Sequence, residues 1–214
     1  MEEARGRKGK LASASNMQGR TTLQETLAAI AAREYQQAGE IALRGVATPM
    51  RAAGEALAGL IEAFAQPGTG GVEWRDRVVV ALDDTVPKLL DGMQALYANV
   101  LFERLLHPRD EQLFKLDVPG ADDVDTRAAA DVAKQGAHRA TLDHAGQAFG
   151  ESTRLLETVL RVAETWSSCA NDVEKLKEFY PLAETGAKEM MERATTLRIA
   201  AAVFRGAPDV TPDS

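Results

Sequence analysis

The sequence predicts an all-α protein: three to four long, kinked, coiled-coil-like helices in an elongated bundle. Alanine, which has the highest helix propensity, is abundant, whereas the aromatic residues that favour strands make up only 5 % of the 214 residues. Apolar residues also recur at alternating steps of three and four along most of the chain, as they do on the buried stripe of a helix.

Charge divides the chain into a tail and a body. Residues 1–20, rich in Gly, Ser, Arg and Lys, carry five basic and two acidic side chains and are predicted to form a flexible basic tail. Residues 21–206 are predicted to form a single helical-bundle domain, and residues 207–214 a flexible C-terminal tail. Because the chain beyond residue 20 carries 20 basic and 30 acidic side chains, we expect no nucleic-acid partner.

The first long helix is expected to run from Thr22 to Gln66. Thr22-Leu23-Gln24-Glu25 has the pattern of a capping box, in which a hydroxyl and a carboxylate each accept a free backbone N–H at the helix start. Pro49 interrupts the pattern and disfavours helical geometry at the residue before it, so we expect a kink at Thr48.

A second helix is expected after the glycine-rich break at 67–71. Its apolar series runs from Val79 to Val100. Pro87 lies inside that series. Either Thr85 caps a new helix with the proline in its first turn, or one longer helix bends there. Further along, Asp122, Asp123 and Asp125 are expected to cap the start of a third helix, since the glycine and distal glutamate of a calcium-binding loop are absent.

The third segment has the most regular pattern. Its apolar residues follow a heptad alternation that slips by one step of three before Leu176. Ser167, Ser168, Asn171 and Asp172 precede the slip. A turn there would give a four-helix bundle, whereas a kink would give three long helices. We expect this packing seam to contain Phe149, Leu156, Val159, Trp166 and Val173.

The two tryptophans are expected to have different environments. Trp166 lies in the packing seam, between positions occupied by small alanines, and is therefore predicted to be a core residue. Trp74 follows the glycine-rich break, and it either covers the end of the bundle or contacts a partner.

Nothing in the sequence predicts catalysis or a cofactor. His107 lies one turn after Glu103, but the paired Glu-x-x-His motifs of a di-iron bundle are absent, so no metal site is expected. Cys169 has no histidine near it in sequence, and the glycines at 68–71 are not followed by the Lys-Ser/Thr of a phosphate-binding loop. We therefore expect a non-enzymatic protein without a cofactor.

The cellular location is expected to be the cytoplasm. The chain has one cysteine, so no intramolecular disulfide forms, and its longest apolar run, near Ile199–Phe204, is far shorter than a membrane span. The N-terminus lacks the apolar stretch of a secretion signal.

Residues 82–106 and 171–197 resemble the middle and last helices of the BAR superfamily, whose members bend membranes as dimers. The resemblance covers about 180 residues of helix pattern and includes the basic N-terminus. The resemblance implies membrane binding as a dimer. Independently of it, the long apolar seams predict a helical scaffold that self-associates as a homodimer and binds a protein partner, and the basic tail is expected to touch an anionic membrane surface through Arg5, Arg7, Lys8 and Lys10. Residues 103–139 depart from the family's basic face, since they hold six basic and eight acidic side chains.

A second resemblance is to the all-α ligand-binding half of TetR-type repressors, which are similarly helical and acidic. It implies a regulatory domain that binds a small molecule in a pocket between helices. The helix-turn-helix that such repressors use to read DNA is not found at the N-terminus.

Overall fold

The computed structural model describes residues 18–67, 71–106, 138–170 and 172–206. All regular secondary structure in these ranges is helix. The helices are α2 (Gln18–Ala31), α3 (Tyr35–Arg44), α4 (Ala47–Ala65), α5 (Val72–Leu106), α7 (His138–Cys169) and α8 (Val173–Gly206). No strand occurs in these ranges. The predicted all-α class is therefore confirmed.

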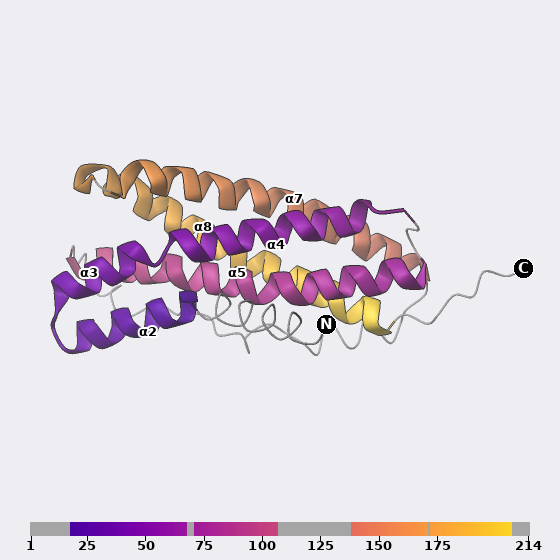
Figure 1. The fold of residues 1–214 in the computed structure, drawn as a ribbon, viewed down its shortest axis with the longest axis horizontal. Helices are drawn as coiled ribbons and strands as arrows, with labels where there is room; N and C mark the ends of the chain where they lie inside the picture. The colour runs from indigo at the N-terminus through magenta and orange to yellow at the C-terminus, as the bar shows by residue number, and fades with distance from the viewer. Residues whose placement is uncertain (1–17, 68–70, 107–137, 171, 207–214) are drawn as a thin grey trace, which may run out of the picture.

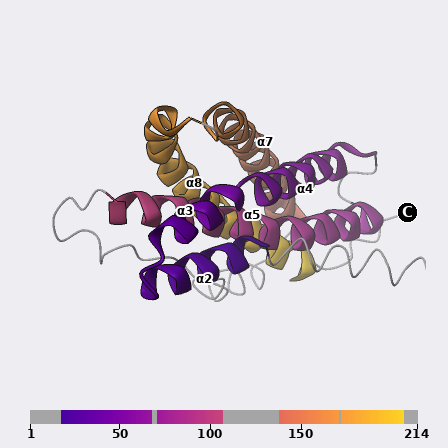
Figure 2. The ribbon, with the colours of Figure 1, turned by 60° about the vertical axis from the view of Figure 1, so that its left-hand side comes forward.

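Helix α5 lies at the centre of the arrangement (Figure 1). It packs against α4 and α8 on one side and against α2 and α3 on the other, while α7 closes the group by contacting α4 and α8. Every residue from Asp91 to Val100 on α5 is buried. The view in Figure 2 shows α7 and α8 stacked above α5, with α2 on the opposite side.

The first expected helix is divided into three. Helix α2 is already helical at Gln18, and Thr22 donates its hydroxyl proton to the carbonyl of Gln18 at 2.8 Å inside that helix, so the capping box predicted at Thr22 is wrong. The chain then turns at Arg33, whose φ is 63°, a left-handed conformation that ends a helix.

The break expected at Thr48 lies slightly earlier, at Gly45, between α3 and α4. A Cβ at Gly45 would overlap the side chain of Thr22, so glycine allows α2 and α3 to approach closely. Pro49 falls in the first turn of α4, where a missing backbone N–H removes no helical hydrogen bond. The proline therefore marks a helix start instead of a kink.

Of the two alternatives at Pro87, the structure has the single longer helix, since α5 continues from Val72 to Leu106. The hydroxyl of Thr85 lies 2.7 Å from the carbonyl of Ala81 on α5 and 3.2 Å from that of Ala56 on α4. Thr85 thus bridges two helices and does not cap a new one.

The third segment contains a turn, because α7 ends at Cys169 and α8 begins at Val173. The two helices pack against each other as an antiparallel pair (Figure 1). The caps expected at Asp122, Asp123 and Asp125 lie outside the described residues.

The packing seam of α7 is rotated from the predicted one. Phe149 is 41 % exposed and Leu156 is half-buried, so both lie at the edge of the seam, whereas Val159 and Trp166 are buried as predicted. The side chain of Val173 lies outside the described part. The buried series is Ala145, Ala148, Ser152, Leu155, Val159, Val162, Trp166 and Cys169. The two stripes share every seventh residue, so the apolar periodicity of the sequence does not distinguish them, and the packing of α7 on α4 and α8 decides.

Aromatic side chains fill the end of the bundle near the α4–α5 connection. Trp74 is 1 % exposed, and its indole N–H donates to the carbonyl of Phe64 at 3.3 Å. Its ring meets that of Phe204 edge-on, with centroids 5.8 Å apart. Of the two environments expected for Trp74, the structure has it covering the end of the bundle.

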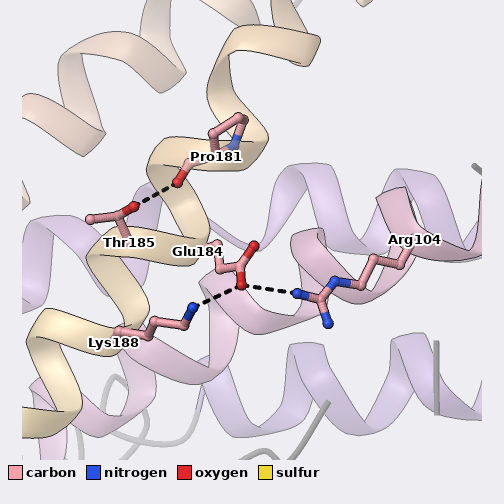
Figure 3. A network of polar contacts seen from close by, with 5 residues as sticks. All are labelled: Arg104, Pro181, Glu184, Thr185 and Lys188. Carbon is pink, nitrogen blue, oxygen red and sulfur yellow. Dashed lines mark hydrogen bonds and ion pairs between the residues drawn. The ribbon is translucent and has the colours of Figure 1, made fainter. Parts of the chain in front are cut away.

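A charged network joins α5 to α8 (Figure 3). Arg104 on α5 and Lys188 on α8 each donate to the same oxygen of Glu184 at 2.9 Å. The hydrogen bond from Lys188 is the main cause that lowers the pKa of Glu184. The network adds a polar contact between α5 and α8 beside the apolar core that the two helices share.

We predict that Trp74→Ala destabilises the fold by about 3–5 kcal/mol, since it opens a void in the aromatic cluster and frees the Phe64 carbonyl. Trp166→Ala should cost less, about 2–3 kcal/mol, because Trp166 borders an open groove that the void would join. Chemical denaturation followed by circular dichroism measures both. A larger loss for Trp166→Ala would contradict this ranking.

Candidate functional site

An apolar groove runs between α4 and α7. Its cavity has a volume of about 600 Å³. From α4 it is lined by Ala47, Met50, Arg51, Gly54, Glu55 and Ala58, and from α7 by Leu156, Val159, Leu160, Ala163, Trp166 and Ser167. Nine of these twelve lining residues are apolar, and among these nine only the indole of Trp166 carries a polar group.

The groove exists because small residues face each other across the two helices. Packed helices lie about 8–10 Å apart, and side chains must fill the space between them. At Gly54, Ala58 and Ala163 the side chains are too short to do so. Val159 lies beneath the opening, since its Cγ1 is 3.6 Å from the position of a Cβ on Gly54.

The rim of the groove combines an exposed leucine with two charges. Leu160 is 51 % exposed, although it belongs to the lining. Arg51 and Glu55 are exposed one turn apart on α4. Further along α7, Phe149 lies in edge-on contact with Phe64 of α4, with ring centroids 6.1 Å apart. The α4–α7 side of the molecule therefore keeps apolar surface in contact with water.

Leu156, Val159 and Trp166, which were predicted to share one seam, come together in the groove lining. Leu160 and the residues that α4 contributes to the groove were not predicted. The available signal was the run of small residues Ala47, Gly54 and Ala58 on one face of α4, with Leu160 just outside the heptad. Arg5, Arg7, Lys8, Lys10 and His107 lie outside the described residues.

A second, smaller cleft lies between α5 and α8. Its volume is about 260 Å³, and Asp83, Val86, Pro87, Arg198, Ala201 and Arg205 line it. Arg205 pairs with Asp83 across the cleft. This ion pair links α5 to α8 across the cleft, whereas the groove between α4 and α7 is open.

A polar layer is buried between α5 and the α2–α3 pair. Asp91, Gln94 and Asn99 on α5 and Thr26 on α2 are buried, and each has a side-chain oxygen without a hydrogen-bond partner. Asn99 donates its amide proton to the carbonyl of Ala42 on α3 at 2.7 Å. This layer was not predictable from the sequence, because these residue types suit the solvent-exposed face of a helix equally well.

Burial raises the pKa of Asp91 from 3.8 to about 7, and the charge of Arg20 partly opposes that rise. Gly19 on α2 packs directly on the backbone carbonyl of Asp91, where a Cβ would overlap it. The backbones of α2 and α5 are therefore in close contact at Asp91, and the carboxyl oxygen Oδ2 of this residue is buried without a hydrogen-bond partner.

The described residues offer no cluster for a metal ion, since no three His, Cys, Asp or Glu side chains gather in them. Cys169 is buried, with its sulfur 3.6 Å from the hydroxyl of Ser168. Within the ranges that the structure describes, no helix is both long and apolar enough to cross a membrane.

No protein family, no curated protein and no solved structure matches the chain.

Asp91→Asn should remove a pH-dependent penalty. Because the pKa of Asp91 is raised on folding, the ionised carboxyl destabilises the fold above pH 7, and the penalty disappears as the pH falls towards 4. At pH 8 we expect the variant to be more stable than the unsubstituted protein, on the order of a few kcal/mol.

Denaturant titrations of both proteins from pH 5 to pH 8 measure the difference. It should shrink steadily as the pH falls. A difference that stays constant across this range would show that Asp91 ionises in the folded protein as it does in water.

Proposed function

We propose that this chain is a non-enzymatic helical interaction protein, and that the groove between α4 and α7 is the surface through which it binds an apolar partner. The observation that carries the proposal is the continuous apolar lining of the groove, with Leu160 half-exposed at its rim. Covering apolar surface is favourable by roughly 25 cal/mol per Å². A partner would therefore gain free energy by closing the groove.

The length of the groove supports a helical partner. The lining on α4 extends from Ala47 to Ala58, and at about 1.5 Å per residue this is roughly 16 Å, or three turns of helix. Amphipathic helices bind apolar grooves through side chains spaced over such a length. The small residues on α4 would let a partner helix approach closely.

The same proposal includes the finer architecture and location predicted from the sequence. It takes α4, α5, α7 and α8 as a kinked, coiled-coil-like bundle of elongated shape, and it takes the protein as a cytoplasmic scaffold. Peripheral binding of a BAR-like module to an anionic membrane through Arg5, Arg7, Lys8 and Lys10 stays a prediction of the sequence.

A second candidate function is favoured by the size of the cavity. A volume of about 600 Å³ falls within the range of roughly 300–1,000 Å³ that small-molecule pockets occupy. Met50 and Trp166 would then contact an apolar ligand, as in the regulatory domain that the TetR-type resemblance implies. The groove is open along one side, which suits a protein partner better than an enclosed ligand.

An apolar fluorescent dye tests whether the groove binds apolar partners. We expect 8-anilinonaphthalene-1-sulfonate to fluoresce in the groove at low protein concentration, and Gly54→Leu to reduce that signal at least about fivefold. A Cβ at Gly54 makes only an ordinary contact with Val159, so the backbone position accepts a side chain, and the remaining carbons of the leucine would occupy the groove that Gly54 lines.

Gly59→Leu is the matched control. It introduces the same side chain on the same helix, where a Cβ meets no atom within 4 Å and where the residue does not line the groove. The control should keep the dye signal. Equal signals from both variants, or none from the unsubstituted protein, would contradict the proposed binding surface.

A further inference from the structure

We infer that the partner in the groove is a second copy of this chain, bound so that the two α4 helices lie antiparallel about a two-fold axis near Gly54. The inference rests on the proposed function, because it names the occupant of the same groove. A two-fold interface uses the same surface on both copies, so that surface must be complementary to itself. The residues of α4 meet that requirement in one register.

When two copies of one helix pack antiparallel, each residue of one copy faces one residue of the other. The sum of the two residue numbers is then the same for every facing pair. If that sum is 106, Arg51 of each copy faces Glu55 of the other, which gives two opposite-charge contacts. Sums of 102 and 110 would instead place two arginines or two glutamates directly opposite each other. Of these three registers, charge favours the one with the sum of 106.

Arg51 and Glu55 are available for this exchange. Both side chains are exposed, and among the described residues neither has an ion-pair partner. They lie one turn apart in the same helix without bonding to each other. A second copy would supply each with its opposite charge close to the two-fold axis.

The same register brings small residues together on both sides of the axis. Ala47 would face Gly59 of the second copy, and Thr48 would face Ala58. A Cβ at Gly59 would meet no atom within 4 Å, so no side chain of its own copy occupies this space. Small residues at facing positions allow two helices to pack closely.

Leu160 lies close to the same axis. Its neighbour Val159 is in contact with the Gly54 position, so Leu160 is level with the middle of α4. It is half-exposed beside a cavity of about 600 Å³. A two-fold axis at this level would place Leu160 of each copy in the groove of the other. The exposed leucine of each copy would thus fill the open groove of the other copy.

Sedimentation equilibrium of the full chain over a wide concentration range tests this pairing. We expect a monomer–dimer equilibrium. Arg51→Glu and Glu55→Arg should each raise the dissociation constant by about tenfold, because each places like charges opposite each other twice. The double variant Arg51→Glu/Glu55→Arg should return it to within about threefold of the original, since the opposite charges are restored.

Leu160→Glu should weaken the dimer by about 100-fold or more, because it places two charges in the apolar grooves. Val80→Glu is its control, since Val80 is 69 % exposed on α5 and does not line the groove. It should leave the dissociation constant unchanged. Circular dichroism of each variant checks that helicity is retained.

A chain that stays monomeric, a dimer that ignores the single charge reversals, or a double variant that fails to recover would each overturn the inference. If the monomeric chain still binds the dye in the groove, the second copy is the wrong occupant and the proposed binding surface survives. If dye fluorescence is insensitive to Gly54→Leu, the proposed function itself fails. Dye displacement as the protein concentration rises would support both.

Discussion

The burial of the Asp91–Val100 part of α5 on all sides is the constraint on which the other contacts depend. Over Asp91–Val100 its Leu and Met side chains face α4 and α8, while Asp91 and Asn99 face the α2–α3 pair. Dehydrating polar groups is costly unless they are hydrogen-bonded. Asn99 meets this requirement through the carbonyl of Ala42, whereas Asp91 responds by holding its proton near neutral pH. The contact between α2 and α5 therefore includes a cost for dehydrating the carboxyl of Asp91.

The central position of α5 also explains the groove. Helices α4 and α8 both pack on α5, and α7 lies across from it, in contact with α4 and α8. The large side chains of α4, such as Met50, Leu57 and Leu60, point into the shared core. Its outer side, with Gly54 and Ala58, is left to face α7 with little to fill the space. Apolar surface that is not buried in the core thus remains along the α4–α7 groove.

The helices and their main breaks were predictable, because apolar periodicity and the Pro-Gly cluster at 67–71 are local signals. The turn at Arg33 was not, since no glycine or proline marks it. The register of α7 was ambiguous, because two stripes share every seventh residue and the large Phe149 favoured the wrong one. The groove could not be predicted either, since small residues in a helix indicate close packing and an unfilled space equally well.

The pairing of the two α4 helices is tested most directly by a distance between copies. A nitroxide label can be attached to an exposed site outside the groove lining by Glu62→Cys, in a Cys169→Ser background that removes the native thiol. In the antiparallel register the two labelled positions lie 18 residues apart along the helices, so pulsed electron paramagnetic resonance should give a distance of about 30 Å. Absence of dipolar coupling, or a distance near the roughly 10 Å of a parallel pair, would contradict the account.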